Sequence, residues 1–169
     1  TWEHMALTRA RPIAGDAGLM REAAEVIARV LQTRRDDGKL KRDIVEMRGL
    51  VEQEKGGEGA WDLKQAPGGM VDIEFIAQYL ALRYGAEKPA ILSAETETVL
   101  ASARKAGVLA AGDAAVLLPA LTLYQNLTQI LRLSVAGIFD PAGAPAGLLR
   151  LLARAGEMPD FASLDAHLR

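Results

Sequence analysis

Apolar residues recur at helical spacing along most of the chain, and this periodicity constrains the possible folds more than any other feature. Over residues 16–34 and 38–54 the apolar positions fall three or four residues apart, and charged side chains occupy positions between them. The same spacing continues over residues 70–84 and 113–136. No segment shows the convincing two-residue alternation of a strand, and no repeat of fixed period is present. We therefore predict an all-α fold, a helical bundle of about seven or eight helices that forms a single helical domain over residues 1–169.

Capping residues and turn signals predict where these helices begin and end. A first helix is expected over residues 1–11, and Asp16 is placed to cap the second. Ser93 is placed to cap a helix that ends near residue 105, and Asp113 opens a long Leu-rich helix that we predict to be buried. Two short helices are expected over residues 147–154 and 160–167. Residues 54–60, EKGGEGA, combine glycines with charges and are predicted to form a mobile loop.

Composition and charge exclude several classes of function. The chain has no cysteine, and its only histidines, His4 and His167, lie at opposite ends, so neither a thiolate site nor a histidine metal site is expected. The formal charge of −2 gives no general attraction to nucleic acid or to an anionic membrane. Residues 106–139 carry few charges, but polar residues and Pro119 interrupt them too often for a membrane span. We predict neither nucleic-acid binding nor membrane insertion.

The stretch DLKQAPGGMVDIEF, residues 62–75, is the part of the chain with the most unusual composition. It places a Pro-Gly-Gly turn directly before a helix, and neither a phosphate-binding loop nor a dinucleotide-binding fingerprint matches it. The turn has two interpretations: it is a simple helix boundary in which Asp72 acts as a cap, or it is an anion site at a helix N-terminus. Lys64 is either a solvated side chain or a residue that approaches a phosphate group.

Glu74 and Asp72 are expected to have separate tasks because they are about 200° apart around a regular helix. This angle prevents the two carboxylates from binding one metal ion. Glu74 lies on a helix that looks buried on two faces, so it needs a partner such as Arg48 or Lys64, and we predict a structural ion pair with Arg48. Arg9 and Arg11, in the segment LTRARP, are interpreted as surface charges rather than as phosphate clamps.

Three blocks of sequence resemble the family of the bifunctional glutamine synthetase adenylyltransferase/adenylyl-removing enzyme. They read TWEHMALTRARPIAGD at residues 1–16, KRDIVEMR at residues 41–48 and DLKQAPGGMVDIEFIAQYLALRYGAEKP at residues 62–89. The blocks follow one another in the family's order. The string VDIEF is closer to the C-terminal half of that enzyme than to its first half, where the segment tends to read REIEF. The chain therefore resembles the C-terminal helical part of the adenylyltransferase half, a fragment of a larger multidomain enzyme.

The resemblance implies a function in nitrogen regulation. In this family one half transfers AMP from ATP to a tyrosine of glutamine synthetase, and the other half removes it by phosphorolysis. It implies Mg2+ and ATP as cofactors of the full-length enzyme, and a cytoplasmic location. It also implies three partners: glutamine synthetase, the PII signalling protein and a preceding nucleotidyltransferase core. The family's core holds its metals with paired aspartates after a Gly-Ser turn, a pattern that this sequence lacks. The fragment alone is thus predicted to be inactive, with no catalytic residue, metal or cofactor of its own.

Within this resemblance, we expect the turn and the acidic helix start to close over the nucleotide side of the missing core. Lys64 would approach phosphate, Gly68 and Gly69 would let the backbone come close, and Asp72 would face the metal or the nucleotide. Two alternatives remain open. The chain is the helical domain of a PII uridylyltransferase, or it is a non-catalytic interaction module that binds glutamine synthetase or PII.

Overall fold

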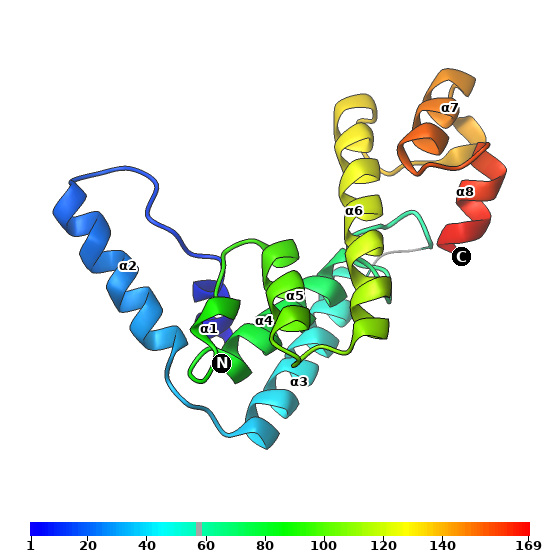
Figure 1. Ribbon diagram of the computed structural model, residues 1–169. Coiled ribbons are helices and arrows are strands. Elements are labelled where there is room, and N and C mark those ends of the chain that lie inside the picture. Colours follow the sequence, from blue (N-terminus) through cyan, green and yellow to red (C-terminus); the bar gives the residue numbers. More distant parts are fainter. Residues whose placement is uncertain (57–58) are drawn as a thin grey trace.

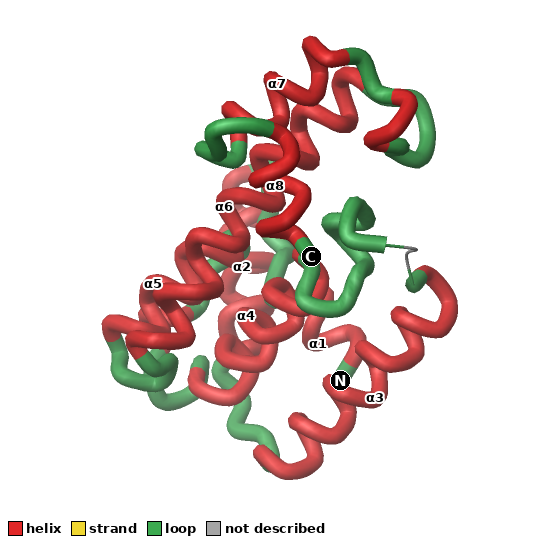
Figure 2. The backbone as a smooth tube through the Cα atoms, turned by 90° about the vertical axis from the view of Figure 1, so that its right-hand side faces the viewer, coloured by secondary structure: helices red, strands yellow, loops and turns green. Residues whose placement is uncertain are grey.

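A computed structural model of the chain describes residues 1–56 and 59–169, and within these ranges every regular element is a helix (Figure 1). The all-α prediction is confirmed, and no strand occurs in the described ranges (Figure 2). Two 3₁₀ turns, Pro89–Ile91 and Pro141–Gly143, lie between the longer elements. The eight α-helices are α1 (Trp2–Leu7), α2 (Ala17–Leu31), α3 (Asp37–Lys55), α4 (Met70–Tyr84), α5 (Thr96–Lys105), α6 (Ala111–Ser134), α7 (Ala146–Ala155) and α8 (Phe161–Leu168).

Aspartate caps start three of the helices. Asp16 accepts hydrogen bonds from the amides of Gly18 and Leu19, 2.8 and 3.1 Å away, as its position in the sequence predicted. Asp36 and Asp160 do the same at α3 and α8. Such caps satisfy amides that have no partner inside the helix. The cap prediction fails at α5, where Ser93 accepts from the amide of Glu95, one residue before the helix begins.

Three hydrophobic clusters hold the helices together. The largest joins α4, α5 and α6 around fully buried side chains that include Ile91 and Leu100. A second joins α1, the end of α2, α3 and α4. In the third, Leu63 from the segment before α4 packs against Leu127, Leu152 and Leu164 of α6, α7 and α8. Helix α4 belongs to the first two clusters, so its position is fixed from two sides.

Helix α6 is far more exposed than the sequence predicted. Only Ala114, Leu121 and Leu127 of its 24 residues are buried, whereas Val116 is 68% exposed and Leu133 is 88% exposed. The reason is its position: α6 runs from the α4–α5 layer to the α7–α8 pair and is covered by each of them on only part of its surface (Figures 1 and 2). By length and composition alone, α6 is the one helix in the described ranges that qualifies as a candidate membrane span.

Helix α2 stands to one side of the other helices and is held mainly at its C-terminal end (Figure 1). Its residues Leu19 and Val26 are 66% and 52% exposed, and only Leu31 is buried. The guanidinium of Arg35 anchors this end, donating to the carbonyl oxygens of Val30 (2.7 Å), Leu31 (3.1 Å) and Thr33 (2.6 Å). One helix thus presents an apolar stripe that the described residues do not cover.

Candidate functional site

The turn before α4 is closed by its own backbone. The amides of Met70 and Val71 donate to the carbonyl oxygens of Leu63 and Lys64, at 2.9 and 3.1 Å, and the amide of Gly69 donates to Ala66 at 2.8 Å. These amides are the ones that a helix N-terminus would offer to an anion. In this protein the preceding loop occupies them, which leaves no open amide cradle at the start of α4.

Glycine is required at each of the two positions in the turn for a different structural reason. Gly68 has φ +79°, a conformation that other residues adopt at a cost. Gly69 has no such torsion, but a Cβ atom there would lie 2.8 Å from the carbonyl oxygen of Ala66 and 3.0 Å from that of Leu63. The glycines therefore allow a close contact between the turn and the backbone of the preceding loop, not one between the backbone and an anion.

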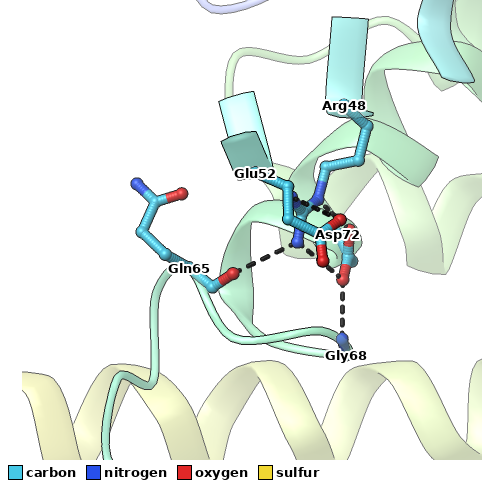
Figure 3. Close-up of polar contacts among 5 residues, drawn as sticks. All are labelled: Arg48, Glu52, Gln65, Gly68 and Asp72. Atoms are coloured by element: carbon cyan, nitrogen blue, oxygen red, sulfur yellow. Dashed lines mark hydrogen bonds and ion pairs between the residues drawn. The ribbon is translucent and has the colours of Figure 1, made fainter. Parts of the chain in front are cut away.

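Asp72 and Arg48 join this turn to helix α3 (Figure 3). The Nε of Arg48 donates to Oδ1 of Asp72, and its Nη2 lies 3.3 Å from Oδ2. Asp72 also accepts from the amide of Gly68 at 2.6 Å, and Arg48 donates to the carbonyl oxygen of Gln65 at 3.2 Å. A carboxylate that reaches back over the first turn in this way acts as a cap. The side chains of Arg48 and Asp72 are 13% and 28% exposed, so most of this network is shielded from water.

The charges around Arg48 favour its protonated state. Its hydrogen bond to Asp72 raises the pKa of the guanidinium, burial opposes this, and Glu52, 3.5 Å from Nη1, adds a second attractive charge. Glu52 lies one turn further along α3, so the arginine is held between acids from two helices (Figure 3). This arrangement fixes the turn on α3 and leaves Asp72 already bound to two protein groups.

Glu74 has a different partner from the one that the sequence predicted. Its Oε1 lies 2.7 Å from Nη1 of Arg9, at the start of the segment that follows α1, while Arg48 pairs with Asp72. The predicted Glu74–Arg48 pair is wrong. The expected separation of Asp72 and Glu74 around the helix axis explains why, since α3 lies on the Asp72 side of α4 and the α1 end lies on the other side.

Arg9 and Glu74 lie in a cleft with a volume of about 440 Å³ whose wall is mainly polar. Arg11, Glu95, Glu97 and Gln125 also line it, so four separate parts of the chain meet there. The sequence predicts surface charges at Arg9 and Arg11 and does not predict that they meet Glu74, Glu95 and Gln125 in one cleft. The only available signal was that both arginines and Glu74 fall inside the blocks that carry the family resemblance.

The remaining predicted residue, Lys64, is exposed beside the turn, and neither a hydrogen bond nor an ion pair involves its amine within the described ranges. No group of three or more His, Cys, Asp or Glu side chains in those ranges is arranged to hold a metal ion. The described residues therefore do not form a fitting site for Mg2+.

The fold and these sites define the class of the chain: it is an all-α helical protein with a structurally closed turn, a polar cleft and no clustered metal ligands within the described ranges. A family model described as GlnD PII-uridylyltransferase matches residues 39–135, more than half of the chain. The chain belongs to that family.

Over its whole length the chain is also similar to proteins named bifunctional glutamine synthetase adenylyltransferase/adenylyl-removing enzyme. It is 51% identical over 169 residues to such a protein from Rhodopseudomonas palustris (strain ATCC BAA-98 / CGA009) and 48% identical over 170 residues to one from Rhizobium meliloti (strain 1021). A third, from Xanthobacter autotrophicus, is 51% identical over 168 residues. All or nearly all of the chain is covered, but only 17% of each relative. The family resemblance predicted from the sequence is confirmed.

Proposed function

We propose that this chain is the helical portion of an enzyme that adenylylates and deadenylylates a tyrosine of glutamine synthetase with ATP, in nitrogen regulation. The observation that carries the proposal is the similarity of the whole chain, at about half identity, to proteins with that name. Because the chain spans about 17% of those relatives, we assign the transfer chemistry, its ATP and its Mg2+ to a preceding nucleotidyltransferase core. The proposal includes a cytoplasmic location and PII as a regulatory partner.

We propose that the turn at residues 62–69 borders the nucleotide bound by that core. Gly68, Gly69 and Asp72 build the turn, and Lys64 is the member of the predicted set whose charged group stays available beside it. Lys64 would then approach a phosphate group, while Asp72 would act through the geometry of the turn. A one-ångström misplacement of a positioning element is enough to slow a transfer reaction strongly.

The first test is AMP transfer from labelled ATP to glutamine synthetase. The 169-residue chain and the same chain joined to the preceding core are compared, and we expect transfer only by the joined protein. In that protein, Lys64→Ala should reduce transfer without changing the urea midpoint, whereas Asp72→Ala should reduce both. Lys105→Ala, an exposed lysine at the end of α5, is the matched control. Activity of the 169-residue chain alone, or normal transfer by Lys64→Ala, would contradict these assignments.

The exposed stripe of α2 favours a second candidate, an interaction module that binds glutamine synthetase or PII without a part in the chemistry. Apolar patches that stay uncovered often mark protein contacts. An interaction module should bind a partner protein as the 169-residue chain alone, and absence of binding to both purified proteins would exclude this candidate.

A further inference from the structure

Helix α2 carries an apolar stripe along its length, and most of that stripe is exposed to water. Leu19, Ala23, Val26 and Val30 follow one another at intervals of four, three and four residues, which places them on one face of the helix. Leu19 and Val26 are 66% and 52% exposed, and Ala23 is exposed as well. The charged residues of α2 lie on a different side: Arg21, Glu22, Glu25 and Arg29. A helix with this division normally packs its apolar face against another element.

The described residues cover α2 at one end only. Ile27 and Leu31, near its C-terminal end, pack in the same hydrophobic cluster as Met5 of α1. No residue of α2 before Ile27 belongs to any of the three clusters that the described residues form. A helix of about 12–15 residues is marginal in water without tertiary contacts, and α2 has 15 residues. In the 169-residue chain, the first half of α2 is therefore expected to open readily and to exchange its amide hydrogens fast.

The longer protein offers a cover for this stripe. The chain covers 17% of each relative, so a protein of their length contains far more residues than these. The proposed function joins a nucleotidyltransferase core to Thr1, directly before α1. Since α1 packs against the C-terminal end of α2, the core would be tethered beside this helix (Figure 1). Trp2, the first residue of α1, is 59% exposed, and tryptophan is enriched where protein surfaces meet.

We propose that the apolar stripe of α2 packs against this nucleotidyltransferase core in the full-length protein. The inference rests on the proposed function, which supplies the core, and adds the surface through which the helical part holds it. A short tether gives the core an effective concentration on the order of 1 mM beside the stripe. Glutamine synthetase, PII or a second copy of the chain would have to reach the same surface from free solution, so the tether favours the core over these occupants.

The test is amide hydrogen exchange, followed by mass spectrometry, in the 169-residue chain and in the chain joined to the core. In the joined protein, exchange in the first half of α2 should be about 10-fold slower or more, because the helix must then break its contacts with the core before it opens. Val26→Ser in the joined protein should remove most of this protection. Val45→Ser is the matched control, because Val45 lies inside α3 and is 63% exposed. Serine and valine have similar helix propensities, so the two variants differ mainly in the surface that they alter.

Protection that Val26→Ser removes and Val45→Ser leaves intact supports the inference. Equal exchange of α2 in the 169-residue chain and the joined protein overturns it, and so does protection that the two variants affect alike. It is also overturned if α2 becomes protected only when purified glutamine synthetase or PII is added, or only as the concentration of the 169-residue chain rises.

The AMP-transfer assay of the joined protein tests the proposed function separately. Transfer by a joined protein in which α2 is unprotected would contradict only the inference. Protection of α2 in a joined protein that transfers no AMP would contradict only the proposed function.

Discussion

Gly68 and Gly69 are adjacent residues that the protein needs for different reasons. Gly68 supplies a positive φ, and its amide donates to Asp72. Gly69 leaves room for three carbonyl oxygens of the preceding loop, all within 3.2 Å of where its Cβ atom would be. The second reason depends on tertiary structure and does not follow from the turn propensity of glycine alone.

This difference predicts the effect of Gly69→Ala. The added methyl group would meet backbone oxygens that cannot move without opening the turn, so we expect a loss of about 1–3 kcal/mol in the free energy of unfolding. Gly49→Ala is the matched control, because Gly49 lies inside α3 with no atom within 4 Å of a Cβ atom. There the substitution should gain about 0.5–1 kcal/mol through helix propensity. Urea denaturation measures both, and equal effects would contradict the steric explanation.

The cap at Asp16, which depends only on near neighbours, was predictable from the sequence, although the cap expected at Ser93 was not formed; residues that act through distant partners were not predictable. Asp16 caps α2 as expected because a cap needs only the amides two and three residues away. The partners of Glu74 and Arg48 depend on which side of α4 each neighbouring helix lies, and periodicity does not contain that information. The sequence therefore predicted that Glu74 needs a partner but assigned the wrong one.

At the scale of elements, polar side-chain contacts join α3 and α4 at two separate places. The Arg48–Asp72 network lies in the second half of α3, and a second contact joins the first residue of α3, Asp37, to α4. The hydroxyl of Tyr79 donates to Asp37 at 2.8 Å, and Arg83 forms an ion pair with the same carboxylate at 3.0 Å. Because these two contacts are separated along the helices, α3 and α4 cannot rotate relative to each other about either contact alone.

Because of the Tyr79–Asp37 hydrogen bond, the free energy of unfolding should vary with pH in the alkaline range. Burial, together with the hydrogen bond to Asp37, raises the pKa of Tyr79 from 10.0 to about 12. The folded state therefore holds this proton more tightly than the unfolded state, so the contribution of Tyr79 is intact below pH 10 and is lost as the pH rises towards 12. The difference in unfolding free energy between wild type and Tyr79→Phe should shrink over that interval. Burial also raises the pKa of Tyr124, so absorbance at alkaline pH should show late-titrating tyrosines, and Tyr79→Phe should remove one of them.

The sequence predicted the number and approximate bounds of the helices, but it did not predict how much of each helix is buried by its neighbours. Helix α6 looked like a buried helix because it is rich in leucine, yet its neighbours cover only parts of it. Helix α1 ends at Leu7, although residues 1–11 looked helical. The predicted mobile loop at residues 54–60 includes residues 57 and 58, which lie outside the described ranges. Hydrophobicity predicts which residues are favoured in the core, but the arrangement of the helices decides which of them are buried.

At the scale of the whole molecule, the loop before α4 connects the α7–α8 pair to the rest of the chain. Trp61 stacks on Phe161 with ring centroids 5.2 Å apart and meets the ring of Phe139 edge-on at 4.8 Å. Its Nε1 donates to Asp165 at 2.7 Å, and this carboxylate also pairs with Arg169 at 2.8 Å. The loop that forms the turn at α4 is therefore also a wall of the α7–α8 cluster.

Replacing Trp61 should loosen the α7–α8 pair selectively. Trp61→Phe keeps an aromatic ring but removes the hydrogen bond to Asp165, with an expected loss of about 1 kcal/mol. Trp61→Ala removes the ring as well and should cost about 3–5 kcal/mol. Amide exchange should then accelerate in α7 and α8 before it does in α5. Trp2→Phe, at a position that is 59% exposed, is the control and should leave the exchange pattern unchanged.

The bond between Trp61 and Asp165 spans 104 residues of sequence, and this separation has a consequence for the time course of folding. Most contacts in a helical protein are local and form early, whereas a contact between remote positions must wait until the entropy of closing the intervening chain has been overcome. The Arg48–Asp72 network spans only 24 residues. The turn at α4 is therefore expected to be assembled first, and the aromatic contacts of Trp61 to be the last step by which a nascent chain completes its tertiary structure.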